Sequence, residues 1–331
     1  MASEKEYEFD ATVVILTYNG EQHLEEILNA VHAQRYGGTF ETLVIDSGST
    51  DSTLDIIAKN PWVRLHQIPN SEFGHGKTRN LGAHLAKGRY VVYLTHDATP
   101  ASDRWLHEIT APFDISERIV AVMGSQVPRA DAFPLLRYDV KNTFASFGPM
   151  HGTTLFYDDD FIQDEGVRNA VTFYSDVNSA ARRSVLTGEI PYRDVSYAED
   201  QLLGRDVIDA GYIKAYAPRA VVWHSNEMTI LEYDDRISGV GGVKVAEAFP
   251  EGRGSPHGCG LRARLTGHYL ASDPVAEGDK LKVPRSGDFV RQSPGCRGWR
   301  RLAAPCTIQF IWRGTLRERN PLLKPNKTAA G

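Results

Sequence analysis

The sequence is poor in cysteine and has no long apolar segment. Its three cysteines, Cys259, Cys296 and Cys306, are far apart and lack the spacing of metal ligands, which favours a reducing compartment. The first ten residues, MASEKEYEFD, contain no apolar signal-peptide core, and no run approaches the roughly 18 apolar residues of a membrane span. We therefore expect a cytoplasmic protein, neither secreted nor integral to a membrane.

Two glycine-rich phosphate-binding motifs are also missing. The first apolar run is not followed by G-x-G-x-x-G, and the chain has no G-x-x-x-x-G-K-[ST], which argues against a dinucleotide fingerprint and a P-loop. A diphosphate bound by this chain would need another cation. With 331 residues, 41% hydrophobic and 24% charged, the chain has an ordinary globular composition. It is long enough for one large α/β domain with an appendage, or for two domains.

Charge is distributed unevenly along the chain. Residues 236–331 contain 17 Lys and Arg against 7 Asp and Glu, whereas residues 1–235 contain 20 against 35. The acidic body argues against nucleic acid as the ligand. The basic C-terminal part could make peripheral contact with an anionic membrane surface, or could simply be a solvated charged surface.

Short β-branched runs alternate with helical patterns between residues 11 and 124. The run TVVIL predicts a strand, and the following segment EQHLEEILNAVHAQ places four apolar residues on one helical face: Leu24, Ile27, Leu28 and Val31. Repeated alternation of this kind predicts an α/β fold with a mostly parallel central sheet and helices on both faces.

Polar residues follow the first two predicted strands. Thr17 and Tyr18 follow one strand in ILTYNG, and Asp46 ends the next in VIDSGSTDST. Neighbouring parallel strands end at the same sheet edge, where such sheets bind ligands. Asp46 could accept from a pyrimidine N–H or a ribose hydroxyl, and Tyr18 could flank a base. Helix capping is the simpler explanation for Ser49 and Asp51.

A second group of residues could handle a diphosphate. Asp97 follows the apolar strand YVVYL and is placed to bind Mg²⁺ or Mn²⁺, with a diphosphate completing the coordination. His224, after AVVW, could add a nitrogen ligand that suits Mn²⁺ better, although a structural role is also open. Arg79, with Lys77 nearby, could neutralise phosphate or pair at the surface.

The acidic pair Glu199 and Asp200 begins a predicted helix. The helix dipole and capping favour acids there, but a carboxylate facing the sheet edge could also act as general base on a hydroxyl. In FYSDVNSAARRSVL, Asp176 and Asn178 could shape an acceptor pocket, together with Glu199. A helix start explains them equally well.

Taken together in order and spacing, the segments VVILTYNG, LVIDSGSTDST, KTRNLGAHLAKGRYVVYLTHDATP and YAEDQLLGRDVIDAGY resemble the family 2 glycosyltransferases of the GT-A fold. The resemblance covers about residues 10–238. FGHGKTRNLG and THDATP look more like the bacterial rhamnosyltransferase branch. Ser47 stands where the family often has a second acid in DDGSTD, and His96 precedes Asp97 where it often has an acidic pair or D-x-D.

The resemblance implies a nucleotide-diphosphate sugar donor, a divalent metal, Mg²⁺ or Mn²⁺, and inverting transfer to a hydroxyl. It implies that Tyr18 and Asp46 meet the nucleoside, that Arg79 lies near the base or phosphate, that Asp97 binds the metal and that Asp200 is the base. From their places at the strand ends we also expect Thr17, His96 and Asp97 at the nucleotide sugar and His224 at the metal. The corresponding division is a tail (1–10), a GT-A domain (11–238) with a nucleotide-sugar-binding half (11–124) and an acceptor half (125–238), and a basic, weakly ordered, glycine-rich appendage (239–331).

The function we expect is transfer of L-rhamnose from dTDP-L-rhamnose to a hydroxyl of a cell-surface polysaccharide or a lipid-linked precursor. Two alternatives stay open, a family 2 transferase that uses a UDP-sugar and a non-catalytic nucleotide-sugar-binding protein. A sugar nucleotidyltransferase should open with a glycine-rich loop that carries arginine and lysine, and ILTYNGEQH does not.

Overall fold

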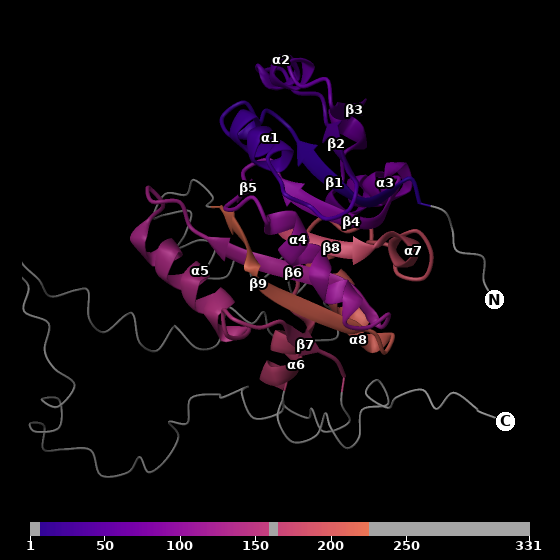
Figure 1. Cartoon of the computed structure of the whole chain (residues 1–331), viewed down its shortest axis with the longest axis vertical. Coiled ribbons are helices and arrows are strands. Elements are labelled where there is room, and N and C mark those ends of the chain that lie inside the picture. Colours follow the sequence, from indigo (N-terminus) through magenta and orange to yellow (C-terminus); the bar gives the residue numbers. More distant parts are fainter. Residues whose placement is uncertain (1–6, 159–164, 225–331) are drawn as a thin grey trace, which may run out of the picture. The chain divides into compact units, whose positions relative to one another are not determined.

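The described part of the chain is built on a nine-stranded mixed sheet (Figure 1). The computed structural model describes residues 7–158 and 165–224. The predicted appendage at 239–331 lies outside these residues, as does the predicted boundary at 238. In sequence order the strands are β1 (Phe9–Thr17), β2 (Phe40–Asp46), β3 (Val63–Gln67), β4 (Gly88–Thr95), β5 (Thr99–Pro100), β6 (Ile119–Val127), β7 (Thr154–Phe156), β8 (Asn178–Arg182) and β9 (Ile213–Trp223).

The strand order is β3-β2-β1-β4-β8-β6-β9-β5, and β7 pairs with β9. The first four strands are parallel to one another, as the alternation of strands and helices predicts. β8 then runs antiparallel between β4 and β6, whereas β6 and β9 are parallel. The sheet is therefore mixed, and β1 to β4 form a continuous parallel part of it.

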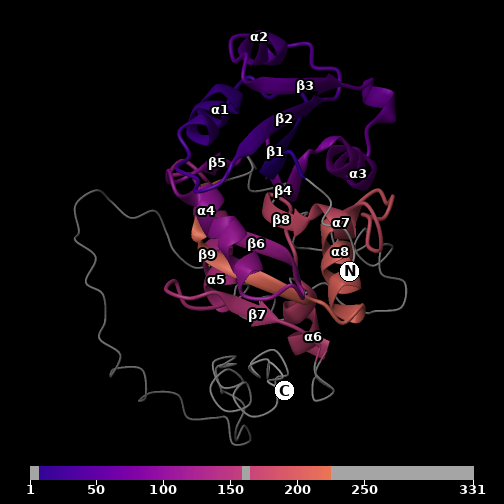
Figure 2. The same cartoon turned by 45° about the vertical axis from the view of Figure 1, so that its right-hand side comes forward.

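Helices cover both faces of the sheet, and the apolar side chains form one core layer on each (Figure 2). Leu24, Ile27, Leu28 and Val31 are all buried, which confirms the predicted face of α1. One layer includes side chains from α1 (Leu24–His32), α2 (Thr53–Ala58) and α4 (Trp105–Thr110). The other includes side chains from α3 (His75–Leu85), α5 (Pro134–Ser146), α7 (Arg183–Leu186) and α8 (Glu199–Asp209).

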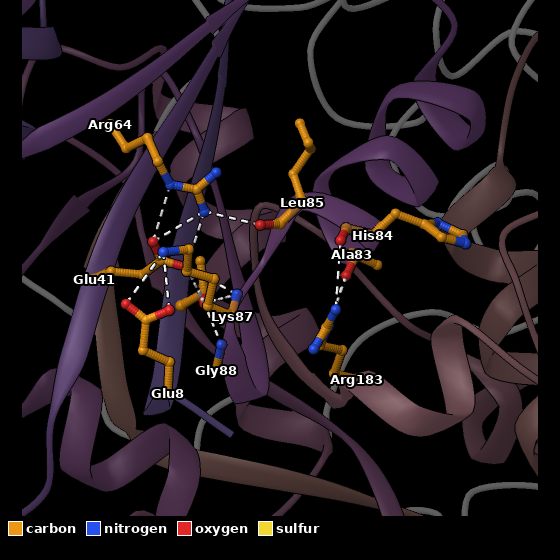
Figure 3. A network of polar contacts seen from close by, with 10 residues as sticks. Glu8, Glu41, Arg64, Ala83, His84, Leu85, Lys87, Gly88 and Arg183 are labelled. Carbon is orange, nitrogen blue, oxygen red and sulfur yellow. Dashed lines mark hydrogen bonds and ion pairs between the residues drawn. The ribbon is translucent and has the colours of Figure 1, made fainter. Parts of the chain in front are cut away.

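The C-terminal end of α3 is held by two arginines at the amino ends of the parallel strands (Figure 3). Arg64 donates to the Leu85 carbonyl at 2.8 Å and forms a forked ion pair with Glu41. Arg183 donates to the Ala83 carbonyl at 3.1 Å. Cations suit the carbonyl end of a helix. These bonds fix the C-terminal end of α3, the helix that carries Arg79 near its middle.

Among the helices of residues 7–158 and 165–224, none has the length and apolar character that a membrane crossing requires. α6 (Glu165–Thr172) and two short 3₁₀ turns complete the described elements.

Candidate functional site

The carboxyl ends of β1, β2 and β4 meet at one edge of the sheet, as predicted. In the strand register Thr17 lies opposite Asp46, and Leu16 lies opposite Thr95. The backbone N–H of Ser47 donates to the Thr17 carbonyl at 3.0 Å, so the first two tips stay joined beyond the strands. The loops that carry the predicted nucleoside contacts are therefore adjacent.

Asp46 builds the loop that follows β2. Its carboxylate is fully buried, and Oδ1 accepts from the N–H groups of Gly48 and Ser49 at 3.0 and 3.1 Å. Oδ2 accepts from the Ser49 hydroxyl. Gly48 has a φ of +84°, a left-handed conformation that favours glycine. Asp46 thus shapes the loop around the site, and its contact with a nucleoside stays a prediction.

Hydrogen bonds also join this loop to the one that follows β1. The N–H of Asn19 donates to Ser49 Oγ at 2.8 Å, and Asn19 Oδ1 accepts from the N–H of Thr50 at 2.9 Å. Asp51 Oδ1 accepts from the N–H of Thr53, the first residue of α2, at 3.0 Å. Asp51 therefore accepts from the first N–H of α2, as capping predicts, whereas Ser49 forms hydrogen bonds within its own loop and to the loop that follows β1. Both loops are fixed before a ligand arrives.

Two buried hydroxyls at these tips lack a hydrogen-bond partner among the described residues. Thr17 and Ser47 are 2% and 1% exposed, and neither side-chain oxygen is paired. Buried polar atoms are normally satisfied, so unpaired ones mark a place where a ligand or water completes the bonding. Tyr18 beside them is 45% exposed, which leaves its ring free to stack. These features suit a nucleoside.

Asp97 and His224 lie together, as predicted from their positions after β4 and β9. Asp97 Oδ2 is 3.3 Å from His224 Nε2, and Asp97 Oδ1 is buried without a hydrogen-bond partner among the described residues. Burial alone would raise the pKa of Asp97, but His224 and, less strongly, the nearby Thr95 hydroxyl and His96 hold it well below its ordinary value. Asp97 is therefore ionised and has one oxygen available. His96 packs against Gly20, where an added Cβ would lie 3.3 Å from the histidine.

The neighbours of His224 set its tautomer. Gln126 Nε2 donates to Ser175 Oγ at 3.0 Å, which turns Gln126 Oε1 toward His224 Nδ1 at 3.1 Å. Nδ1 then carries a proton, and Nε2 faces the Asp97 oxygen either with a second proton, as in the ion pair that lowers the pKa of Asp97, or with a free lone pair. Two acceptors this close are stable only with a proton or a cation between them. Among the described residues no third His, Cys, Asp or Glu joins the pair.

Arg129 was not foreseen from the sequence. Its Nη2 donates to Thr99 Oγ1 at 2.8 Å, and its Nη1 lies 3.2 Å from Glu26 Oε2 on α1. It therefore braces the segment that follows Asp97. Its position after the end of β6 was the available signal, but its partners come from distant segments.

Arg79 occupies a different place from the one predicted. It is 6% exposed, and its guanidinium is paired with Asp176 Oδ2, 3.1 Å from Nε, and with Glu199 Oε1 through Nη1. A guanidinium held by two buried carboxylates is not free to bind phosphate. The same contacts occupy Asp176 and Glu199, which were expected at the acceptor. Arg79, Asp176 and Glu199 instead form an ion-pair cluster next to Asp200.

Asp200 is half-buried at the start of α8. Burial, followed by the charges of Asp176 and Glu199, raises the pKa of Asp200 to about 7, against the opposing effect of Arg79. A carboxyl group in this range accepts and releases a proton near neutral pH, as a general base must. Ala198, which caps α8, has a φ of +63°. Strained backbone of this kind is often found at functional sites.

Asn178 is part of the core rather than the acceptor pocket. It is fully buried, and Oδ1 accepts from Trp105 Nε1 at 2.9 Å. Nδ2 donates to the carbonyls of Ser125 and Ala220 at 3.0 and 2.7 Å. Its amide joins α4, β6, β8 and β9, so we do not assign it to an acceptor.

Comparison with known proteins agrees with this geometry. The model of glycosyl transferase family 2 matches residues 12–187. The chain belongs to this family. Over 234 residues it is 31% identical to the O-antigen chain rhamnosyltransferase RfbN of Salmonella typhimurium, covering 70% of this chain and 71% of the relative. Over 222 residues it is 33% identical to the O-antigen chain rhamnosyltransferase WbaN of Salmonella anatum, covering 66% and 67%.

The fold of this family 2 chain is that of the GT-A transferases. The mannosyltransferase PcManGT from Pyrobaculum calidifontis, crystallised with GDP-Man and Mn²⁺, superposes with a TM-score of 0.53 at 20% sequence identity. The match covers 76% of this chain and 70% of that one. The predicted GT-A fold is confirmed.

Proposed function

We propose that this family 2 glycosyltransferase moves L-rhamnose from dTDP-L-rhamnose to a sugar hydroxyl on a growing cell-surface polysaccharide or its lipid-linked precursor. The observation that carries the reaction type is Asp200, a half-buried carboxyl group whose pKa is raised to about 7. The choice of sugar is supported by the two O-antigen chain rhamnosyltransferases among the relatives, at 31% and 33% identity.

The nucleoside would lie at the tips of β1 and β2. The unpaired hydroxyls of Thr17 and Ser47 can exchange hydrogen bonds with polar groups of a pyrimidine or its sugar. The exposed ring of Tyr18 can stack on the base. Because Arg79 is committed to carboxylates, we assign the exposed Lys77 on the same helix, rather than Arg79, to the diphosphate.

Asp97 and His224 would hold a divalent cation. The unpaired Asp97 Oδ1 and the acceptor atoms that face each other at 3.3 Å fit a metal, and the oxygen-plus-nitrogen donor set favours Mn²⁺ over Mg²⁺. When bound, the metal would neutralise charge on the diphosphate.

Asp200 would take the proton of the acceptor hydroxyl. The hydroxyl oxygen forms a bond to the anomeric carbon, the bond from that carbon to the donor phosphate oxygen breaks, and its electron pair leaves with the nucleoside diphosphate. A single displacement inverts the anomeric configuration. The O-antigen relatives support a polysaccharide acceptor, and a basic C-terminal sequence is compatible with an acceptor at a membrane surface.

Titration calorimetry with a panel of nucleotide sugars tests the donor and the metal together. We expect dTDP-rhamnose to bind in the presence of Mn²⁺, and Asp97→Ala to abolish that binding. Asp103→Ala, which removes an exposed carboxylate paired with Arg35, is the matched control and should bind as wild type. Preference for a UDP-sugar would overturn the donor assignment, and equal binding by Asp97→Ala would overturn the metal assignment.

A further inference from the structure

The guanidinium of Arg79 is ion-paired with two of the three carboxylates that surround it. Arg79 pairs with Asp176 and Glu199, whereas within the described residues it forms no ion pair with Asp200 inside 4.0 Å. Within residues 7–158 and 165–224, Asp200 Oδ1 accepts from the backbone N–H of Gln201, at 2.8 Å, Oδ2 accepts from that of Asp176, at 3.4 Å, and neither oxygen has another hydrogen-bond donor. Asp200 is thus the carboxylate of the cluster that lacks a cation of its own.

Asp176 is held so that it cannot turn away. It is 1% exposed, and Oδ1 accepts from Ser179 Oγ at 2.7 Å and from the Tyr192 hydroxyl at 2.9 Å, while Oδ2 faces Arg79. The Arg79 guanidinium also lies 5.8 Å from the centre of the Tyr192 ring. The cluster is fixed from α3, from the segments before α8 and from β8.

The backbone of α3 also helps to hold Arg79 beside Asp176 and Glu199. At Gly76, three residues before Arg79, an added Cβ would lie 2.2 Å from the Arg193 carbonyl oxygen. The backbones of α3 and of the segment before α8 therefore approach so closely at Gly76 that a residue with a Cβ would not fit. The Tyr93 hydroxyl donates to the Arg79 carbonyl at 2.7 Å. Both contacts bring Arg79 between its two carboxylates.

Three carboxylates around one guanidinium leave an excess of negative charge. Asp176 and Glu199 are each in direct contact with Arg79, whereas Asp200 is not. Burial, and less strongly the charge of Glu199, raise the pKa of Asp176 as well, against the opposing effect of Arg79. We propose that Arg79 and Asp176 are a positioning pair for Asp200: the guanidinium is committed to Asp176 and Glu199, and the fixed Asp176 carboxylate leaves the unpaired Asp200 as the proton acceptor that faces the acceptor hydroxyl. The inference rests on the proposed function, in which Asp200 is the base.

The charged and titratable groups that face Asp200 are few. They are Asp176 and Tyr174 from the segment before β8, Glu199 from α8 and Arg79 from α3. If Arg79 paired with Asp200 instead, the carboxylate would be stabilised and would become a weaker base. Because Arg79 pairs with Asp176 and Glu199 instead of Asp200, Asp200 remains a stronger base than it would be in an ion pair with Arg79.

The direct test is Asp176→Asn, which keeps the shape of the side chain and removes one negative charge. We expect the acidic limb of the kcat–pH profile to move at least one pH unit toward lower pH, with an unchanged KM for the donor. ¹³C NMR titration of the Asp200 carboxyl, assigned by its absence in Asp200→Asn, should show the same movement without any turnover. If Asp176→Asn shifts neither the acidic limb of the kcat–pH profile nor the NMR titration of Asp200, the proposal is overturned.

Two further variants make the result specific. Asp206→Asn removes a carboxylate from the same helix that pairs with the exposed Arg193, and it should leave the profile in place. If Asp176→Asn does not fold, Glu199→Gln removes the other charge next to Asp200 and should move the profile in the same direction. If Asp206→Asn shifts the kcat–pH profile as far as Asp176→Asn does, the proposal is also overturned.

The two claims can fail separately. If Asp200→Asn transfers sugar at the wild-type rate, the proposed base is wrong, and the NMR titration still reports on the cluster. If Asp200→Asn is inactive and Asp176→Asn leaves the profile unmoved, the base stands and the positioning pair is refuted.

Discussion

Asp200→Asn should make the protein more stable at pH 8 while it removes the base. The folded state raises the pKa of Asp200 from an ordinary 3.8 to about 7. Between these two pH values the folded state binds a proton that the unfolded state has released, so the contribution of Asp200 to stability falls as pH rises from about 4 to about 7. Above pH 7 the folded protein carries the full cost of a poorly compensated charge.

The size of the effect follows from the pKa difference. At full strength it corresponds to roughly 4 kcal/mol. Because Asp200 retains some contact with solvent, which weakens the effect, we expect about 1–2 kcal/mol. Asparagine carries no charge, so the free energy of unfolding of the variant should exceed that of wild type by this amount at pH 8 and match it within about 0.5 kcal/mol near pH 4.

Urea denaturation of both proteins at pH 4, 6 and 8 measures the difference directly. Comparison of the two proteins at each pH cancels the titration of all other groups. Asp206→Asn should show no gain at any pH, because its carboxylate pairs with Arg193. A loss of stability in Asp200→Asn at pH 8, or a difference that does not change with pH, would refute the reasoning.

Three further changes test other parts of the structure. Lys214→Met should raise the free energy of unfolding at pH 7 by about 1–3 kcal/mol. Burial strongly depresses the pKa of the Lys214 ammonium, and no ion pair compensates its charge in the described residues. A lower free energy of unfolding for the variant in urea denaturation would contradict this. Asn178→Ala should lower it by about 2–4 kcal/mol, because Trp105 Nε1 and two carbonyls lose their partner; a change below 0.5 kcal/mol would contradict the structural role. Gln126→Leu should weaken Mn²⁺ binding, measured by calorimetry, by about tenfold through lost orientation of His224; unchanged affinity would argue against the tautomer assigned here.

Local patterns were enough to predict the parallel half of the sheet. Apolar spacing alone identified the buried face of α1, and the alternation of strands and helices identified β1 to β4 and their common edge. Asp97 and His224 were placed together because both follow strands, and the structure brings them within 3.3 Å. Strand-end positions are therefore informative when the strands themselves are strongly apolar.

The role of Arg79 could not be predicted in the same way. Its partner Glu199 lies 120 residues later, and their contact depends on β8 entering the sheet antiparallel to β4. β8 is short, with the sequence NSAAR, and its periodicity is weak. A basic residue near a helix start looks like a phosphate ligand until long-range packing supplies two carboxylates.

Donor turnover by Asp200→Asn decides whether the cluster at α8 is catalytic. Calorimetry would give the affinity for dTDP-rhamnose with Mn²⁺, and release of dTDP to water would give turnover when no acceptor is supplied. We predict that the variant binds the donor within about twofold of wild type and loses about 10²–10⁴-fold in turnover, the range typical of a missing general base. Turnover within a few-fold of wild type, with binding intact, would contradict the assignment of Asp200 as the base.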